Sequence, residues 1–295
     1  MRGEARHRRR ASPRPLPPCP IPCRLCETAM PQPSGHALIT GASSGIGREI
    51  AREYARRGVP LILSARREPL LQALAEELRA QVPVQIVVAD LADPAAPAAL
   101  VAELERRGLA VRILVNNAGY GVPGRFPDSD WATHAAFLQV MVGAVCELTW
   151  RLLPALRASG QGRILNVASF AALVPGADGQ TLYAAAKSFM LRFSESLALE
   201  NADRGVNVCA LCPGFTWSEF HDVTGTREQM DKLPRWAWLQ TAAVARAGID
   251  GAERGHVRVV PGAFYRALLG LVALLPNALL LKAMRRGSQR IRPLD

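Results

Sequence analysis

Three glycines stand between an expected strand and an expected helix. Gly41, Gly45 and Gly47 follow the apolar run 36–40 and precede a segment in which apolar residues recur at helical spacing. In this order, the free N–H groups of the helix N-terminus converge above the strand, where a pyrophosphate can approach a backbone without side chains. A strand-to-helix turn without a ligand is the alternative for this stretch taken alone. The residues that we expect to contact the bound group here are Gly41, Ser43, Ser44, Gly45, Ile46 and Gly47.

A tyrosine and a lysine form a second group of residues that can do chemistry. Tyr183 and Lys187 are one helical turn apart, so an expected helix over about 182–201 places both side chains on one face. On an isolated surface helix such a pair does no chemistry. Ser169 and the pair Pro213-Gly214, however, each follow directly on an apolar run that predicts a strand. Because ligands bind at the carboxyl ends of parallel strands, we expect all these groups around one cleft.

Residues at the ends of three further strands indicate the kind of ligand. Arg66 and Arg67 follow the second expected strand, where NAD needs a carboxylate for its ribose 2′-hydroxyl and a 2′-phosphate needs cations. Two arginines and no acid favour NADP(H) over NAD(H); a solvated helix start is the alternative for these arginines. Asp90 ends the third strand, where it can accept a hydrogen bond from an adenine amino group. The further residues that we expect to contact this ligand are Leu91, Asn116, Ala118 and Gly119.

The rest of the chain supplies the alternating elements that hold these residues. We expect strands at about 36–40, 59–65, 84–90, 111–115, 163–168, 206–211 and 256–260, and helices at about 48–58, 68–79, 93–108, 130–158 and 182–201. The helix 130–158 should break or bend at Pro154. Near-continuous apolar strands separated by helices predict a parallel sheet of about seven strands covered on both faces. Right-handed crossovers make it a doubly wound α/β fold of the Rossmann type.

Length and charge distribution limit the number of domains and the kind of partner. A chain of 295 residues with 49% hydrophobic residues can bury one large core, so we expect a single α/β domain with basic tails. The formal net charge of +11 is concentrated at the ends, because residues 1–29 carry +5 and residues 281–295 carry +4. The nearly balanced body between them argues against a nucleic-acid groove.

The first 29 residues differ from the rest in composition. They are rich in arginine and proline and lack the apolar stretch of a secretory signal peptide. We expect a disordered leader, which can be an upstream extension of a chain that naturally starts at Met30, then the α/β domain over 30–262 and a C-terminal segment over 263–295. No metal site is expected: the leader's cysteines lack a nearby fourth ligand, and Cys209 and Cys212 lie on an apolar strand.

Five ordered motifs together resemble the short-chain dehydrogenase/reductase family, in its single-domain branch. They are the run Thr40 to Gly47, the run Asn116 to Gly119, Ser169, the pair Tyr183 and Lys187, and Pro213-Gly214. The resemblance covers about residues 35–260, and two helical stretches within it are most similar to bacterial DltE-type oxidoreductases. It implies an enzyme that transfers hydride between NADP(H) and a carbonyl or alcohol substrate. The cofactor would also contact Tyr183, Lys187, Pro213 and Gly214.

The resemblance implies a role for each catalytic residue. Tyr183 would exchange a proton with the substrate oxygen, although a free tyrosine has a pKa of about 10. The ammonium of Lys187 and an oxidised nicotinamide would lower that pKa, and Ser169 would hold the substrate oxygen by a hydrogen bond. Met141 stands where the family has an asparagine that supports a proton relay, and a thioether cannot replace an amide. The alternative hypothesis is therefore a cofactor-binding but catalytically impaired sensor or scaffold.

Two segments after the sixth strand complete these expectations. The resemblance implies a substrate lid over about 214–255, whose aromatic residues form either an apolar substrate wall or a small satellite core. The apolar run 267–281 contains Pro276, is too short to span a bilayer and precedes basic residues. It packs over the cleft or a subunit interface, or it lies on an anionic membrane surface. We expect no spanning segment and a homo-oligomer that is cytoplasmic or membrane-peripheral.

Overall fold

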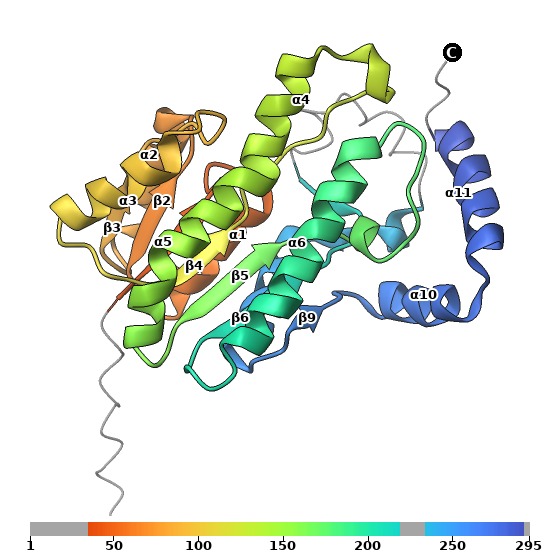
Figure 1. Cartoon of the computed structure of the whole chain (residues 1–295). Coiled ribbons are helices and arrows are strands. Elements are labelled where there is room, and N and C mark those ends of the chain that lie inside the picture. Colours follow the sequence, from red (N-terminus) through yellow and green to blue (C-terminus); the bar gives the residue numbers. More distant parts are fainter. Residues whose placement is uncertain (1–34, 219–233, 292–295) are drawn as a thin grey trace, which may run out of the picture. The chain divides into compact units, whose positions relative to one another are not determined.

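The computed structural model describes residues 35–218 and 234–291, with side chains as far as residue 286 (Figure 1). The chain divides into two units, Met1–Gln32 and Pro33–Asp295, and every described residue belongs to the second. The predicted leader 1–29 therefore lies outside the described residues. So do residues 219–233 of the predicted lid.

A seven-stranded sheet forms the centre of the second unit, and all its neighbouring strands are parallel. The strand order β3-β2-β1-β4-β5-β6-β9 confirms the predicted doubly wound sheet. The strands are β1 His36–Thr40, β2 Leu61–Ser64, β3 Val84–Ile86, β4 Val111–Asn116, β5 Arg163–Val167, β6 Asn207–Leu211 and β9 Arg258–Val259. The order reverses between β1 and β4, so the topological switch point at which such sheets bind ligands lies there.

Helices cover both faces of the sheet (Figure 1). The first face carries α1 Gly45–Arg56, α2 Glu68–Leu78 and α9 Thr241–Glu253, and the second carries α3 Ala96–Arg106, α5 Ala144–Ala158 and α6 Thr181–Glu200. Within β1, Ala37 and Ile39 pack into the core on the first face and Leu38 into the core on the second. Because strand residues point alternately to the two faces, a strand that is apolar at every position is what this layered core requires.

The predicted helix 130–158 is interrupted, but not where the sequence predicted. It consists of α4 Trp131–Leu138, a π-helical segment η2 Gln139–Gly143, and α5, which continues through Pro154. The helix therefore does not break at Pro154. Pro154 removes the hydrogen bond to the carbonyl oxygen of Trp150, and Trp150 is exposed, so water can replace the missing donor.

The edge strand β3 is shorter than the predicted range 84–90, and β9 at the other edge is shorter than 256–260. Part of the ladder next to β2 nevertheless continues beyond β3, since Ala89 N donates to Ala65 O at 3.3 Å. Asp90 therefore still leaves the sheet at its carboxyl edge.

Part of the predicted lid 214–255 belongs to the core. Within α9, Val244 and Ile249 are completely buried and pack against the first face of the sheet. A lid can therefore comprise only the stretch before α9. Its described parts are β7 Thr216–Trp217, the 3₁₀ turn η4 Arg235–Ala237 and β8 Leu239–Gln240, and β7 pairs in parallel with β8.

The C-terminal segment forms two helices, α10 Ala263–Leu274 and α11 Asn277–Ile291. Pro276 stands at the break between them, because proline cannot continue a helix that needs its N–H group. The sequence predicted this interruption.

One helical stretch of the described chain, Trp131–Ala158, is long and apolar enough to cross a membrane by length and composition alone. Leu148, Leu152 and Leu156 of this stretch are buried in the core on the second face of the sheet. The burial of these side chains explains the apolar composition, so the stretch is a core helix.

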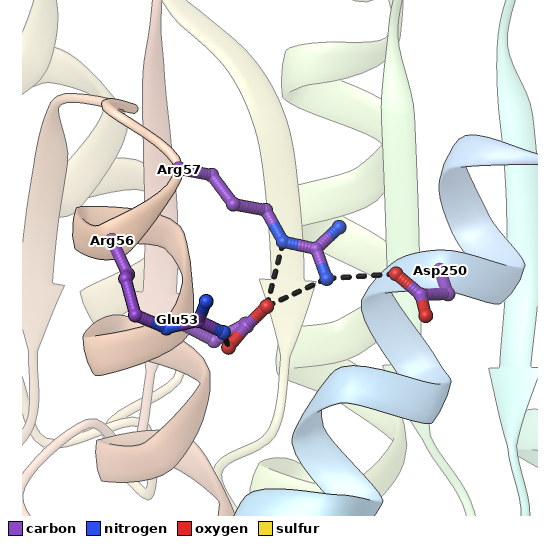
Figure 2. A network of polar contacts seen from close by, with 4 residues as sticks. All are labelled: Glu53, Arg56, Arg57 and Asp250. Atoms are coloured by element: carbon purple, nitrogen blue, oxygen red, sulfur yellow. Dashed lines mark hydrogen bonds and ion pairs between the residues drawn. The ribbon is translucent and has the colours of Figure 1, made fainter.

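A network of ion pairs joins α1 to α9 (Figure 2). The Arg57 guanidinium donates from Nε to Glu53 Oε1 and from Nη2 to Asp250 Oδ1, both at 2.7 Å. Arg56 also pairs with Glu53. Glu53 is buried, so its carboxylate depends on these two arginines to compensate for lost hydration. Because α1 begins at the glycine turn, this network helps to fix the turn relative to the core.

Replacing Asp250 with alanine should lower the free energy of unfolding by about 1 kcal/mol, because it removes one charge-assisted hydrogen bond from a partly exposed pair. Urea unfolding measures the change. The matched control is Asp203→Ala, since Asp203 is more exposed and, within the described part of the chain, pairs only with its neighbour Arg204, at 3.5 Å. Equal effects of the two substitutions would show that the bridge to α9 does not stabilise the fold.

Candidate active site

A large cavity lies at the carboxyl edge of the sheet, at the switch point between β1 and β4. Its volume is about 1040 Å³, and Gly41, Ser43, Ser44, Gly45 and Ile46 line it. Gly41 and Gly45 have φ angles of +64° and +55°, which only glycine adopts without strain. The first N–H groups of α1 have no partner within the helix, and they border this cavity. The arrangement is that of an anion site.

The Thr40 hydroxyl ties the glycine turn to the loop after β4. Its Oγ1 donates to Val115 O at 3.1 Å and accepts from the backbone N–H groups of Asn117 at 3.0 Å and Ala118 at 3.2 Å. The Asn117 side-chain amide donates to the carbonyl oxygens of Thr40 and Gly41, both at 3.0 Å. One hydroxyl and one amide thus join the strand ends on the two sides of the switch point. No sequence pattern indicates this role of Asn117.

Two residues that were expected to contact the ligand, Gly47 and Asn116, do not line the cavity. A Cβ on Gly47 would lie 2.4 Å from Asn117 Nδ2, so this glycine lets α1 pack closely on the loop after β4. Asn116 is the last residue of β4, and its buried Nδ2 donates to Thr149 Oγ1 at 3.2 Å and Asn166 Oδ1 at 2.8 Å. Successive strand residues point to opposite sides, which is why Asn117 and not Asn116 borders the cavity.

The Asn116 side chain belongs to a buried polar network that holds α6. Asn166 Nδ2 donates to Ser194 Oγ at 2.8 Å, and Ser194 Oγ donates to Met190 O at 2.7 Å. These bonds run from β4 through β5 to α6, which carries the tyrosine and lysine pair. Buried polar groups that satisfy each other in this way fix one relative position of their elements.

The ends of β2 and β3 bring two arginines and a carboxylate to the cavity. Arg66, Arg67 and Asp90 line it and are exposed, and the buried Leu91 lines it beside them. Arg67 Nη2 donates to Ser43 Oγ at 3.1 Å, which links the end of β2 to the glycine turn. In doubly wound folds, the 2′-substituent and the adenine of a dinucleotide bind at the position that these side chains occupy.

The structure brings Ser169, Tyr183 and Lys187 into the same cavity. Ser169 follows β5, and its Oγ accepts a hydrogen bond from Ala171 N at 3.1 Å. Tyr183 and Lys187 are one turn apart on α6, with Lys187 Nζ 5.9 Å from the centroid of the tyrosine ring. Lys187 Nζ donates to Val167 O at 2.6 Å, so the end of β5 holds the ammonium in place.

Burial lowers the pKa of Lys187 to about 8, because the ammonium loses hydration that the neighbouring groups only partly replace. At neutral pH the lysine therefore keeps its proton in most molecules. A positive charge beside a phenol stabilises the phenolate, so this ammonium can assist proton transfer by Tyr183.

Met141 lies in the π-helical segment η2, beside the lysine. It is completely buried and packs with Phe137 and Ala186. A Cβ on Gly119 would lie 2.8 Å from Met141 Sδ and 3.8 Å from Lys187 Nζ, so these three residues meet at one point. Single π-helical turns are frequent at functional sites. The thioether fills this position but offers the lysine only a weak hydrogen-bond acceptor.

The loop after β6 forms another side of the cavity, with Pro213 and Gly214 in its lining. A Cβ on Gly214 would lie 2.0 Å from the ring of Tyr265, so only glycine lets this ring pack against the loop. The Tyr265 hydroxyl donates to Ala237 O at 2.7 Å and accepts from Phe215 N at 2.9 Å. Tyr265 thereby fastens α10 to the cavity, a role that no sequence pattern indicated.

Apolar side chains of η4, α10 and α11 line the rest of the cavity. We call them the apolar wall: Trp236, Phe264, Leu268, Leu271, Val272, Leu275, Leu280, Ala283 and Met284. Trp236 packs edge-on against Phe264, with ring centroids 4.8 Å apart. These contacts match the expectation that the C-terminal apolar run packs over the cleft.

The aromatic residues of the lid region divide between the two expected roles. Trp217 stacks on Trp238 with ring centroids 4.2 Å apart, and Trp238 is buried, so this pair is a satellite core. Trp236 instead borders the cavity and is exposed. Only Trp236 of these three residues belongs to the apolar wall.

Within the described residues no cluster of histidine, cysteine or carboxylate side chains could hold a metal ion. Cys209 and Cys212 pack into different clusters of the core. Burial raises the pKa of both thiols to about 12, so they stay protonated as small apolar side chains.

Comparison with known proteins identifies the family. The family model described as short chain dehydrogenase matches residues 35–229, about two-thirds of the chain. The chain belongs to this family. Sulfoacetaldehyde reductase from Chromohalobacter salexigens is 38% identical to this dehydrogenase over 212 residues, which are 70% of this chain and 82% of that protein.

Two solved structures have the same fold as this dehydrogenase. A short-chain dehydrogenase from Sphingobium yanoikuyae in complex with NADPH matches with a TM-score of 0.70 and 32% identity, over 83% of this chain and 98% of that one. The bulky-bulky ketone specific alcohol dehydrogenase from Comamonas testosteroni matches with a TM-score of 0.68 and 28% identity, over 84% of this chain and 97% of that one. This dehydrogenase is an oxidoreductase that uses a nicotinamide cofactor.

The residues that line the cavity fit such a cofactor. The positive φ angles of Gly41 and Gly45 leave the N-terminus of α1 open to a pyrophosphate. The side chains at the ends of β2 and β3 can bind the adenosine half, and the loop after β6 and the tyrosine and lysine pair border the other half of the cavity.

Proposed function

We propose that this dehydrogenase transfers hydride between NADP(H) and a bulky apolar carbonyl compound or its alcohol, with Tyr183 as the acid/base. One observation carries the proposal: the glycine turn, the residues Ser169, Tyr183 and Lys187, and the apolar wall all line a single cavity. The cofactor, when bound, supplies the hydride to the carbonyl carbon or accepts it in the reverse direction.

The protein's own residues handle the proton. In the reducing direction Tyr183 Oη gives its proton to the substrate oxygen and becomes a phenolate. The Lys187 ammonium, held at 2.6 Å by Val167 O, stabilises that negative charge. Ser169 Oγ donates to the substrate oxygen, which orients the carbonyl and stabilises the charge that develops on it. In the oxidising direction the Tyr183 phenolate takes the proton from the alcohol, while Lys187 and Ser169 keep the same roles.

The hypothesis of an impaired sensor or scaffold has less support. Met141 removes an amide from the relay position, but each group that acts on the substrate oxygen in the proposal lines the cavity. The similar proteins are named as a reductase and dehydrogenases. We therefore favour an active enzyme in which the proton reaches Tyr183 without an amide at residue 141.

The preference for NADP(H) rests on the end of β2. Arg66 and Arg67 both line the cavity there, and no acidic residue of the described lining follows this strand directly. Guanidinium groups bind a 2′-phosphate by paired charge-assisted hydrogen bonds, whereas NAD offers only hydroxyls. The similar structure from Sphingobium yanoikuyae, which contains NADPH, supports the same preference.

Replacing Arg66 with aspartate should lower kcat/KM for NADPH about a hundredfold, since two charge-assisted hydrogen bonds to the phosphate are lost and a repulsive charge is added. The value for NADH should change by less than about threefold, because NADH lacks the phosphate. Steady-state kinetics with both nucleotides measures the two changes. Arg79→Asp is the matched control, because Arg79 is exposed just after α2 and does not line the cavity. An unchanged ratio of the two kcat/KM values in Arg66→Asp would contradict the NADP assignment.

The substrate class rests on the apolar wall. Its side chains carry no charge and include two large aromatic rings, Trp236 and Phe264. Such a surface favours a large apolar group beside the reacting carbonyl and offers nothing to a sulfonate. One similar protein is named for bulky ketones and another for sulfoacetaldehyde. The apolar wall suits a bulky ketone better than it suits sulfoacetaldehyde.

Assembly and location stay part of the proposal. We propose a homo-oligomer that resides in the cytoplasm or at the periphery of a membrane. Light scattering on the purified full chain tests the oligomeric state, and a mass equal to that of one chain would contradict it.

A further inference from the structure

The helices α10 and α11 also carry large apolar side chains that do not line the cavity. Leu274 is 82% exposed, Leu279 is 55% exposed and Leu281 is 49% exposed, and none of the three lines the cavity. We call these three residues the leucine patch. In Figure 1 the two helices follow β9 as a pair, coloured blue. Large exposed apolar side chains that line no cavity are candidates for an interaction site.

Other side chains of the same helices line the cavity. Leu268 and Val272 of α10 and Leu280 and Met284 of α11 line the cavity, at the spacing that one helix face requires. The cavity therefore explains only these apolar side chains, and the leucine patch needs a different explanation.

The charge on these helices indicates which kind of partner binds the leucine patch. From residue 263 to residue 286 the chain contains Arg266, Lys282, Arg285 and Arg286 and not one acidic residue. The last three follow the patch directly, and all four are exposed. A second copy of this chain would bring the same positive charges to the interface without a carboxylate from these helices to pair with them. An anionic surface, by contrast, complements them.

We propose that the leucine patch and the cations Lys282, Arg285 and Arg286 dock this protein on an anionic lipid surface. The leucines enter the boundary between headgroups and acyl chains, and the cations bind the lipid phosphates. The helices lie on the surface and do not cross it, because α10 has 12 residues and a span needs about 20. The inference stands apart from the proposed chemistry, since docking requires no turnover.

The test is flotation of the full-length protein with lipid vesicles. Vesicles of phosphatidylcholine alone are compared with an equal mixture of phosphatidylcholine and phosphatidylglycerol. We expect the protein to float with the mixed vesicles and not with the neutral ones, and we expect high salt to release it, because salt screens the attraction of the cations. No flotation with the mixed vesicles would overturn the proposal.

Two variants separate docking by these helices from binding by the basic N-terminal residues. The combined change Lys282→Gln, Arg285→Gln and Arg286→Gln should weaken binding about a hundredfold, since each surface cation contributes about fivefold. Leu274→Glu with Leu279→Glu should weaken it by at least about tenfold through the loss of apolar burial. Leu199→Glu is the matched control, because Leu199 is 79% exposed on α6 and should leave binding unchanged.

Each contrary result has a definite meaning. Binding that persists in both variants would assign the lipid contact to the seven arginines of residues 1–29 and overturn the proposal. A dimer that Leu274→Glu with Leu279→Glu dissociates, without vesicle binding by the unmodified protein, would assign the patch to a second copy and overturn it as well. Circular dichroism of the variants confirms that they are folded, since all the replaced side chains are exposed.

Discussion

Replacing Tyr183 with phenylalanine is expected to lower kcat about a thousandfold, because the group that exchanges the proton is removed. The dissociation constant for NADPH should stay within about twofold, since one hydroxyl lost from the nicotinamide end removes little of the cofactor's binding free energy. Steady-state kinetics with a saturating ketone measures the first quantity, and a fluorescence titration measures the second.

A control with the same chemical change is available in the core. Tyr54 lies on α1 and is completely buried, and its hydroxyl has no hydrogen-bond partner among the described residues. Tyr54→Phe should therefore leave both kcat and the affinity for NADPH unchanged. A Tyr183→Phe variant that keeps more than a tenth of the activity would show that another group transfers the proton.

Replacing Lys187 with methionine is expected to abolish turnover and also to change how stability depends on pH. The pKa of Lys187 falls from 10.5 to about 8 on folding, because burial removes hydration from the ammonium. Below pH 8 both folded and unfolded chains hold the proton, and the folded state bears the unfavourable burial of the charge. Between pH 8 and pH 10.5 the unfolded chain binds more protons, so the lysine makes stability rise with pH.

The size of this effect follows from the pKa shift. A change of one pKa unit corresponds to about 1.4 kcal/mol, so the unfolding free energy should gain about 3 kcal/mol across this window from Lys187 alone. Urea unfolding at pH 7.5 and pH 10.5 measures the gain, and Lys187→Met should lack it. Lys282→Met, at an exposed position within α11, is the control in which the gain should persist. A gain of equal size in Lys187→Met would show that other groups cause it.

The doubly wound parallel sheet could be predicted from the sequence because each strand is apolar at nearly every position. Ala37, Leu38 and Ile39 illustrate this: all three are buried, yet they face two different layers of helices. Such runs are clear signals of strands buried on both sides, and the crossover rule then leaves few topologies. The residues that follow the strand ends could be assigned to one cleft for the same reason.

Expectation and structure differ where the direction of a side chain depends on a shift of one residue along a strand. Asn116 and Asn117 are adjacent and chemically identical, but the end of β4 turns the first into the core and the second to the glycine turn. No residue type near position 141 indicates the π-helical segment there. Pro154, by contrast, suggests a break, although α5 continues through it. Tyr265 reaches the cavity only because Gly214, far away in sequence, leaves room for its ring.

The C-terminal helices show a different limit of the sequence. An apolar run on a helix predicts burial, but it does not say against what. In α10 and α11 some apolar residues line the cavity, while Leu274 and Leu279 remain exposed. The first group suits packing over the cleft, and the second suits contact with a membrane surface.

We propose that this dehydrogenase binds NADP(H) and reduces bulky apolar carbonyl compounds at Tyr183 within one cavity. The most direct test follows the oxidation of NADPH by the full-length protein with a panel of bulky aryl ketones and with sulfoacetaldehyde, and repeats it with NADH. We predict turnover of the bulky ketones, with kcat/KM at least about tenfold higher with NADPH than with NADH and at least about tenfold higher than for sulfoacetaldehyde. Tight binding of NADPH without oxidation by any carbonyl, or equal use of both nucleotides, would contradict the account.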